Sequence, residues 1–222
     1  LLAFVGAPLA LWLIESPGAV GQAGHAARPQ AESKAALLRS FRFWSVAGAF
    51  AIVWVTQTAF LTHEINIFVP VVGAAGAAAA VAATTFAAVA GRLLLGAVVD
   101  RLDRRLATAV SVASQAGALV ALVLWPEPAV FYGAAVLYGL SVGNVITLPA
   151  LIVQQEFEPA AFGAVVALMT SVTQMFGAFG PALLGFGRDL AGRYGWPLAC
   201  CALANLCAAL GIVLLRPGRR PA

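Results

Sequence analysis

The chain has 222 residues, of which 62% are hydrophobic and only 10% charged, with a net charge of +4. Soluble domains are about half apolar and a quarter charged, so this composition excludes an ordinary soluble domain and indicates a chain whose solvent is lipid. The basic balance does not indicate nucleic-acid binding, because the arginines stand at the ends of apolar runs and form no stripe of their own. These runs are continuous and not alternating, which predicts spanning helices and excludes a membrane β-barrel.

The N-terminal part divides into an apolar end and a polar linker. Residues 1–14 are apolar but shorter than the roughly 20 residues that span a bilayer, so we interpret them as the end of a transmembrane helix whose start is missing. No cationic segment precedes this run, which argues against a signal peptide. Residues 15–42 are rich in glycine, proline and polar side chains without an apolar period. They predict a flexible linker that ends in a short surface helix over residues 32–39.

Six complete spans are expected after the linker, within residues 43–215. Their approximate bounds are 43–68, 71–99, 106–125, 129–153, 162–186 and 197–215. Pro70 marks the first turn, Asp103 is placed to cap the third span, and residues 187–194 are expected to form a loop. The predicted fold class is therefore all-α and polytopic, with six complete transmembrane helices plus the end of a seventh.

The basic residues give the expected orientation, because cytoplasmic loops carry an excess of arginine and lysine. All of them except Arg188 and Arg193 fall on one side of the predicted spans. The linker, the segment between the second and third spans and the tail 216–222 are therefore expected in the cytoplasm. The acidic segment 154–159 lies on the same side, contrary to the excess of basic residues expected there. Acidic residues have little influence on the orientation, so the predicted topology is unchanged.

The segment between the second and third spans holds a large share of the chain's charge. Its members are Gly91, Arg92, Gly96, Asp100, Arg101, Arg104 and Arg105. Arg92, Gly96 and Asp100 are four residues apart, so on a helix they share one stripe, and we expect a neighbouring backbone to approach over Gly96. Asp100 stands where the helix should end, a position where the helix dipole disfavours an anion. Simple anchoring of a membrane helix is the alternative interpretation of this cluster.

With this cluster, the topology resembles the C-terminal half of a major facilitator superfamily (MFS) transporter. The pattern Gly91-Arg92, Gly96, Asp100-Arg101 and Arg104-Arg105 resembles the superfamily's signature between helices 8 and 9, except that Leu102-Asp103 stands where a glycine is usual. The segment 176–185, followed by Asp189 and Tyr194, resembles helix 11 and the loop after it. His63 resembles a histidine in helix 7 of bacterial members of the monocarboxylate/oxalate type.

The resemblance implies half of an MFS fold in a bacterial plasma (inner) membrane and secondary active transport of a small solute by alternating access. Coupling to a proton or counter-solute gradient is expected. The charged cluster would then be a gating motif, in which Asp100 bonds to a helix N-terminus or a basic group of an N-terminal six-helix half that this sequence lacks. The alternative is a non-transporting helical membrane scaffold or a channel subunit.

Polar side chains inside the spans are the candidates for substrate binding, because transporters place their sites near the midplane between the repeats. Glu64 beside His63 would suit a proton carrier, although both would also suit the water boundary. No arginine or lysine lies at the middle of any predicted span, so either the other half supplies a cation or the substrate is neutral, cationic or amphipathic. The candidates are Gln57, His63, Glu64, Tyr138, Asn144 and Gln174.

Other patterns predict packing and not chemistry. Gly139 and Gly143 form a small-xxx-small face that is typical of close helix packing. Cys200, Cys201 and Cys207 lack the spacing of a metal or redox pair and are interpreted as small buried residues. No sequence motif of a membrane enzyme is present, so no catalytic residue, metal or cofactor is expected.

Overall fold

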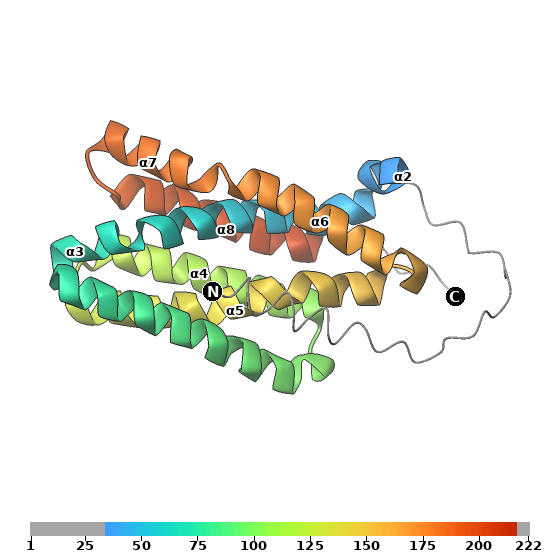
Figure 1. Ribbon diagram of the computed structural model, residues 1–222, viewed down its shortest axis with the longest axis horizontal. Helices are drawn as coiled ribbons and strands as arrows, with labels where there is room; N and C mark the ends of the chain where they lie inside the picture. The colour runs from blue at the N-terminus through green and yellow to red at the C-terminus, as the bar shows by residue number, and fades with distance from the viewer. Residues whose placement is uncertain (1–33, 217–222) are drawn as a thin grey trace, which may run out of the picture. The chain divides into compact units, whose positions relative to one another are not determined.

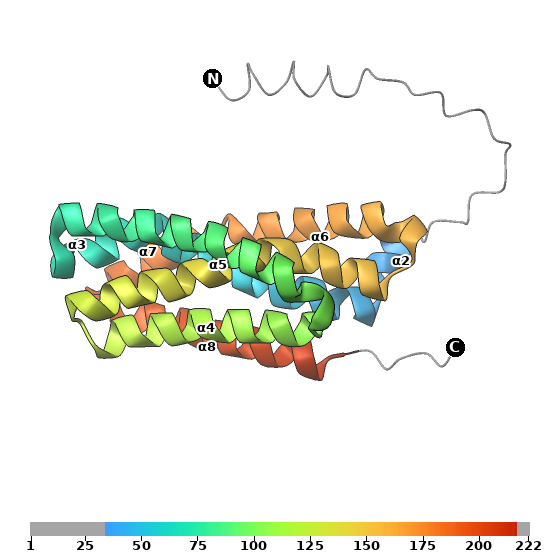
Figure 2. The ribbon, with the colours of Figure 1, turned by 90° about the horizontal axis from the view of Figure 1, so that it is seen from below.

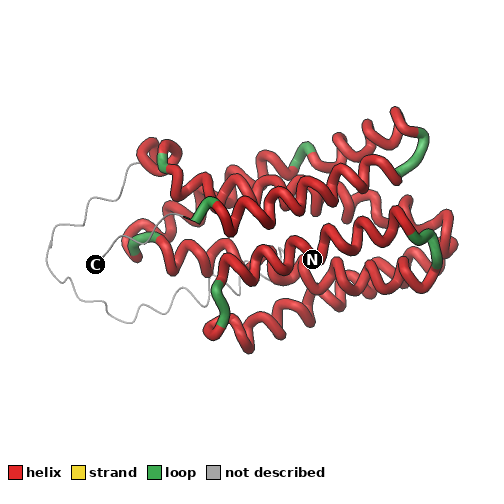
Figure 3. Tube along the Cα trace, turned by 180° about the vertical axis from the view of Figure 1, so that it is seen from behind, coloured by secondary structure: helices red, strands yellow, loops and turns green. Residues whose placement is uncertain are grey.

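The computed structural model describes residues 34–216, which are helical apart from short connections (Figures 1 and 3). No strand occurs in this range, so the predicted all-α class is confirmed. The helix end predicted for residues 1–14, most of the linker 15–42 and nearly all of the tail 216–222 lie outside the described residues.

Five segments of the described chain are long and apolar enough to cross a membrane. One of them, Phe41–Arg101, covers the first two predicted spans, and another, Pro159–Ala191, covers the fifth. The chain is therefore an integral membrane protein with several spans. The helices are α2 (Lys34–Arg39), α3 (Phe41–Val98), α4 (Arg104–Leu124), α5 (Pro128–Glu156), α6 (Phe162–Gly177), α7 (Gly180–Ala191) and α8 (Gly195–Leu214), with the 3-10 turns η1 (Val99–Arg101) and η2 (Pro159–Ala161).

Helix α3 consists of two helical halves that run in opposite directions and meet at Gly73 (Figure 1). The turn predicted at Pro70 is displaced, because Pro70 lies inside the first half. Gly73 has φ 72° and ψ 172°, a conformation that side-chain-bearing residues rarely adopt, so the chain reverses there and not at the proline.

The second half of α3 packs against α5 with its backbone in direct contact. A Cβ at Gly143 would enter the carbonyl of Ala88, and a Cβ at Gly91 would enter that of Leu140. The small-xxx-small face is thus a packing surface, as predicted. Within the described residues no backbone approaches Gly96, because nothing lies within 4 Å of a Cβ built there, so the approach expected over it stays a prediction. The face toward α5 carries Gly91, and Gly96 lies on the exposed side of the helix.

The fifth span is interrupted between α6 and α7, where a short loop is visible in Figure 3. Pro181 has no N–H group, so the regular helical hydrogen bond from residue 181 to the carbonyl of Gly177 cannot form. Thr58 of α3 donates its hydroxyl to this carbonyl instead, at 2.7 Å. The interruption is therefore held against the first half of α3, where a Cβ at Gly177 or Gly180 would collide with Trp54 or Val55.

Two further expectations are corrected by the structure. The predicted loop 187–194 is mostly helical, because α7 continues to Ala191 and ends only at Gly192, which has φ 69°. The cysteines were expected to be buried, but Cys200 and Cys207 are exposed on α8 and Cys201 is half-buried. A cysteine is a small apolar side chain, which suits a surface against lipid as well as an interior.

The helices α4 and α8 lie side by side, and α5 packs along both α3 and α4 (Figure 2). One end of this bundle holds the start of α3, the start of α4 and the ends of α5 and α8, and we call it the basic end. Arg42, Arg104, Arg105 and Arg216 lie there.

Candidate gating and substrate sites

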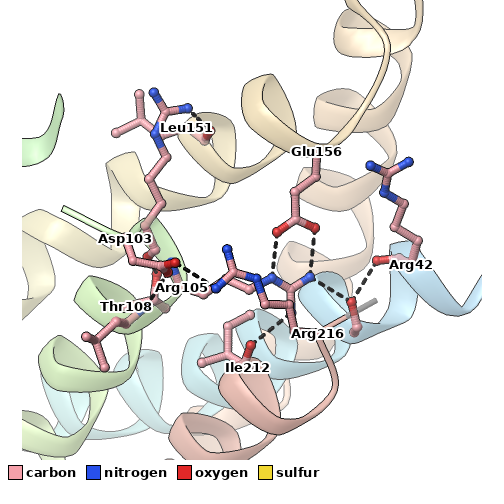
Figure 4. A network of polar contacts seen from close by, with 11 residues as sticks. Arg42, Asp103, Arg105, Thr108, Leu151, Glu156, Ile212 and Arg216 are labelled. Carbon is pink, nitrogen blue, oxygen red and sulfur yellow. Dashed lines mark hydrogen bonds and ion pairs between the residues drawn. The ribbon is translucent and has the colours of Figure 1, made fainter. Parts of the chain in front are cut away.

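The basic end is built around the first turn of α4 (Figure 4). The carboxylate of Asp103 accepts the backbone N–H groups of Arg105 and Leu106 at 3.0 and 3.1 Å, which confirms the predicted cap. Its other oxygen pairs with Arg216 at 2.6 Å. The N–H of Leu106, followed by Arg216 and the N–H of Arg105, lowers the pKa of Asp103 below its ordinary value, although partial burial opposes this shift. Asp103 therefore fixes both the start of α4 and the end of α8.

Arg105 fastens four helices together at the basic end (Figure 4). Its side chain is 2% exposed, and its guanidinium donates to both carboxylate oxygens of Glu156, at 2.6 and 2.8 Å. It also donates to the carbonyl of Ile212 at 2.8 Å and to the hydroxyl of Ser45 at 2.9 Å. Glu156 belongs to the acidic segment 154–159, which did not fit the predicted charge pattern. It is the partner of a buried arginine, a role that was not predicted from the sequence.

Two more arginines of the basic end contact neighbouring elements. Arg104 donates to the carbonyl of Leu151 on α5. The guanidinium of Arg42 lies over the ring of Phe157, 5.1 Å from its centroid. Both contacts lie inside the described bundle, so Arg104 and Arg105 of the predicted motif have structural partners within this chain.

The other part of the motif faces outward. Arg92, Gly96, Asp100 and Arg101 are exposed, and neither charged side chain of the stripe Arg92–Gly96–Asp100 forms an ion pair or hydrogen bond with a described residue. The motif therefore divides into an inner pair, Arg104 and Arg105, and an outer stripe of exposed residues. The cation Arg92 and the open glycine Gly96 of this stripe lie on α3, and the anion Asp100 lies in the following turn η1.

The neighbours His63 and Glu64 have different surroundings. Glu64 is 2% exposed and accepts the hydroxyl of Thr84 at 2.5 Å, so it does not lie at a water boundary within this bundle. His63 lies 3.1 Å from the carbonyl of Pro181 and 3.0 Å from the hydroxyl of Tyr194. The carbonyl can only accept, so in the neutral imidazole Nε2 of His63 carries the proton and Nδ1 accepts from Tyr194. His63 thus links α3 to α7 and to the connection before α8.

Gln57 belongs to a buried amide network that sequence reasoning missed. Its Oε1 accepts from Gln115 of α4 at 3.1 Å, and Oε1 of Gln115 accepts from Asn205 of α8 at 3.4 Å. Asn205 in turn accepts the hydroxyl of Thr56 at 2.6 Å. All four side chains are buried. The only sequence signal was a single amide in each of the spans 106–125 and 197–215.

Two candidates on α5 carry polar atoms without a partner among the described residues. Tyr138 is fully buried with its ring 4.3 Å from that of Phe60, and its hydroxyl has no hydrogen bond there. Asn144 donates to Ser111 at 3.2 Å, while its Oδ1 has no partner. Asn144 lies at a cavity of about 530 Å³ between the second half of α3, α4 and α5, whose other lining residues are mostly apolar.

Gln174 on α6 is exposed and lies at a second cavity, of about 290 Å³, between the first half of α3, α5 and α6. Its Oε1 accepts the indole N–H of Trp54 at 2.6 Å. The structure does not gather the six predicted substrate residues into one site. Gln57, Glu64 and Tyr138 lie inside the bundle, His63 is half-buried between helices, and Asn144 and Gln174 line separate cavities.

Comparison with protein-family models identifies a family for most of the chain. Residues 1–181 match the Major Facilitator Superfamily. No curated protein matches the chain. The match covers most of the chain and agrees with the apolar helices, and the superfamily consists of transporters and not of enzymes. The chain therefore belongs to the Major Facilitator Superfamily and is a membrane transporter of that type.

Proposed function

We propose that this chain is the C-terminal six-helix half of a secondary active transporter, which moves a small solute by alternating access together with an N-terminal six-helix half. The observation that carries this proposal is the exposed stripe Arg92–Gly96–Asp100. Charged side chains at the end of a membrane helix are costly unless they find water or a partner. Gly96 leaves open space beside them, enough for a second helix to approach.

Exposed polar side chains within the spans support the same proposal. Thr62, Thr85, Thr170 and Gln174 are all exposed in the bundle, away from its two ends. The hydroxyl of Thr85 donates to the carbonyl of Val81 in its own helix. Lipid would leave the hydroxyls of Thr62 and Thr170 and the NH₂ group of Gln174 without a partner among the described residues, whereas a water-filled cavity between two halves satisfies them. These positions fit a bundle that is covered by another protein body on part of its surface.

The gating motif then has two tasks. Arg105 and Glu156 hold the ends of α3, α4, α5 and α8 as one body, which suits rigid-body rocking between the two access states. Asp100 would bond to the other half in one of these states and release it in the other. The arginine excess supports a cytoplasmic position for the basic end, with the inner membrane of a bacterium as the expected location.

The carboxyl of Glu64, and not the imidazole of His63, carries the coupled proton in this proposed function. Glu64 is a buried carboxyl whose one described hydrogen-bond partner outside its own helical half is Thr84. Both ring nitrogens of His63 are engaged within the bundle, which leaves it a linking role. The resemblance to monocarboxylate and oxalate transporters depends on His63. Because its contacts indicate a linking role, monocarboxylates and oxalate are not proposed as substrates.

The gating proposal is tested by Asp100→Ala in the full-length protein, with initial solute uptake and the amount of inserted protein measured together. A latch worth 1–3 kcal/mol between states predicts that uptake falls by about fivefold or more while insertion is unchanged. Glu127→Ala is the matched control, because Glu127 is an exposed carboxylate at the opposite end of the bundle. Undiminished uptake in the Asp100 variant would overturn the latch.

The coding sequence upstream of residue 1 tests the proposal that this chain is the C-terminal half of a longer transporter. Six further spans with a second copy of the charged motif are expected there. Their absence would refute the proposal that this chain is the C-terminal half of the transporter. Glu64→Gln should abolish proton-driven accumulation and preserve solute exchange, and intact gradient-driven uptake in this variant would refute the coupling role.

A further inference from the structure

A cavity of about 290 Å³ opens between the first half of α3, α5 and α6. This volume is close to the lower limit of known small-molecule sites. Phe50, Pro149 and Met169 contribute to an apolar wall, and the remaining lining residues are Trp54, Val145, Ile146, Ala150, Val166, Thr170, Thr173 and Gln174. The polar groups come from α6 and from the indole of Trp54. The cavity therefore combines a mostly apolar body with a small polar edge, which is the usual composition of a solute site.

The amide of Gln174, at the polar edge of the cavity, has a defined orientation. The indole N–H of Trp54 can only donate, and it donates to Oε1 of Gln174 at 2.6 Å. This bond orients the amide, because the oxygen must face the indole. The NH₂ group of Gln174 is then the free polar end, and it offers hydrogen-bond donors. A ligand that meets this end needs an acceptor, such as a carbonyl or ether oxygen.

The lining carries no formal charge. No Asp, Glu, Lys, Arg or His is among the residues that line this cavity. A buried anion or cation needs a partner of opposite charge or a metal, and a site of this composition offers neither. The lining that this chain supplies thus favours an uncharged group over a carboxylate or an ammonium.

From these observations we infer that the cavity is a substrate subsite for an uncharged solute with a hydrogen-bond acceptor beside an apolar body, the acceptor being bound by the Gln174 amide that Trp54 orients. The inference rests on the proposed transport function and names the substrate class of the same protein. The apolar body lies against Phe50, Met169 and Pro149.

Uptake kinetics of a transported solute in the full-length protein provide the first test. Gln174→Glu keeps the oxygen that accepts from Trp54 and keeps the side-chain size, but it removes the NH₂ donors. This substitution should raise the KM about tenfold and leave the maximal rate within about twofold of the wild-type value, because the acceptor group of the bound solute loses its donor. Trp54→Phe should raise the KM by a smaller factor, since the ring remains and only the orientation of the amide is lost. Ser171→Ala is the matched control, an exposed hydroxyl on α6 that does not line the cavity.

Thiol labelling tests the cavity with defined probes. Thr170→Cys is introduced after the native cysteines have been replaced, and its rate of maleimide labelling is measured with benzamide, benzoate or benzylammonium, which share one ring and differ in head-group charge. Benzamide should slow labelling most. Ser171→Cys should be labelled on the same helix without protection.

The outcomes separate this inference from the proposed function. Stronger protection by benzoate or benzylammonium, or a KM lowered by Gln174→Glu, would overturn the uncharged-acceptor class. Continued uptake with no protection by any probe would remove the cavity as a substrate site while transport by the protein stands. A full-length protein that transports no solute of a broad panel would instead refute the proposed function.

Discussion

Replacing Glu156 by glutamine should destabilise the bundle through the buried guanidinium of Arg105. The side chains of Arg105 and Glu156 are 2% and 14% exposed, so the pair is largely removed from water. Removing one partner of a buried ion pair costs about 3–5 kcal/mol, because the remaining charge is uncompensated. The glutamine oxygen still accepts one bond, and the bonds from Arg105 to Ile212 and Ser45 remain, so we expect the lower value, about 3 kcal/mol. For an unfolding unit of 150–250 residues, the size of this chain, this loss corresponds to a midpoint lowered by about 6–12 °C.

The assay is thermal unfolding of the full-length protein in detergent, followed by far-ultraviolet circular dichroism. A thiol-reactive dye is unsuitable, because Cys200 and Cys207 are exposed before unfolding. Glu158→Gln is the matched control, a neighbouring exposed carboxylate that forms no ion pair with a described residue. Arg105→Met combined with Glu156→Leu should be more stable than Glu156→Gln alone, since no charge is left unpaired. Equal midpoints of Glu156→Gln and the wild type would refute the reasoning.

Three further predictions use the same unfolding measurement. Gly91→Ala should cost about 1–3 kcal/mol because its Cβ enters the backbone of α5, whereas Gly96→Ala fills open space and should be neutral or stabilise by up to about 1 kcal/mol; equal midpoints would contradict the assigned faces. Thr58→Val should cost about 1–3 kcal/mol by leaving the last carbonyl of α6 without its donor, and Thr58→Ser should restore the midpoint. Asp103→Ala should cost about 1 kcal/mol at neutral pH through the lost cap. Because the N–H of Leu106 lowers the pKa of Asp103, this contribution is complete above about pH 4 and is lost as the pH falls through the lowered pKa, so a difference that persists in strong acid would refute it.

The sequence could predict those parts of the fold that depend on local chemistry. Apolar runs long enough to cross a bilayer predict helices, because each helix satisfies its own backbone hydrogen bonds in lipid. The cap at Asp103 was predictable for a similar reason, since its partners are the N–H groups two and three residues ahead. Chain reversals were predicted less well, because Pro70 only weakens a helix, whereas Gly73 provides the positive φ that the reversal requires.

The candidate site was harder to predict, because it depends on which helices are neighbours. The sequence pattern grouped Arg105 with Asp100 in one motif, but the structure pairs Arg105 with Glu156, 51 residues away, and leaves Asp100 exposed. The seven-residue spacing of Gln57 and Glu64 indicates a shared helix face, and both side chains are buried. It could not tell whether that face turns toward a substrate cavity or toward the interior of the bundle, where the structure has both side chains.

The sequence by itself thus determined the class of the protein, its spans and the asymmetry of its charges, because hydropathy and charge are properties of each segment alone. Only the tertiary structure decided which polar groups are satisfied inside the bundle and which face outward. It separated the inner pair Arg104 and Arg105 from the outer stripe Arg92–Gly96–Asp100. The physical reason is that the cost of burying a charge or an amide depends on the partners that packing brings to it, and these partners come from distant helices.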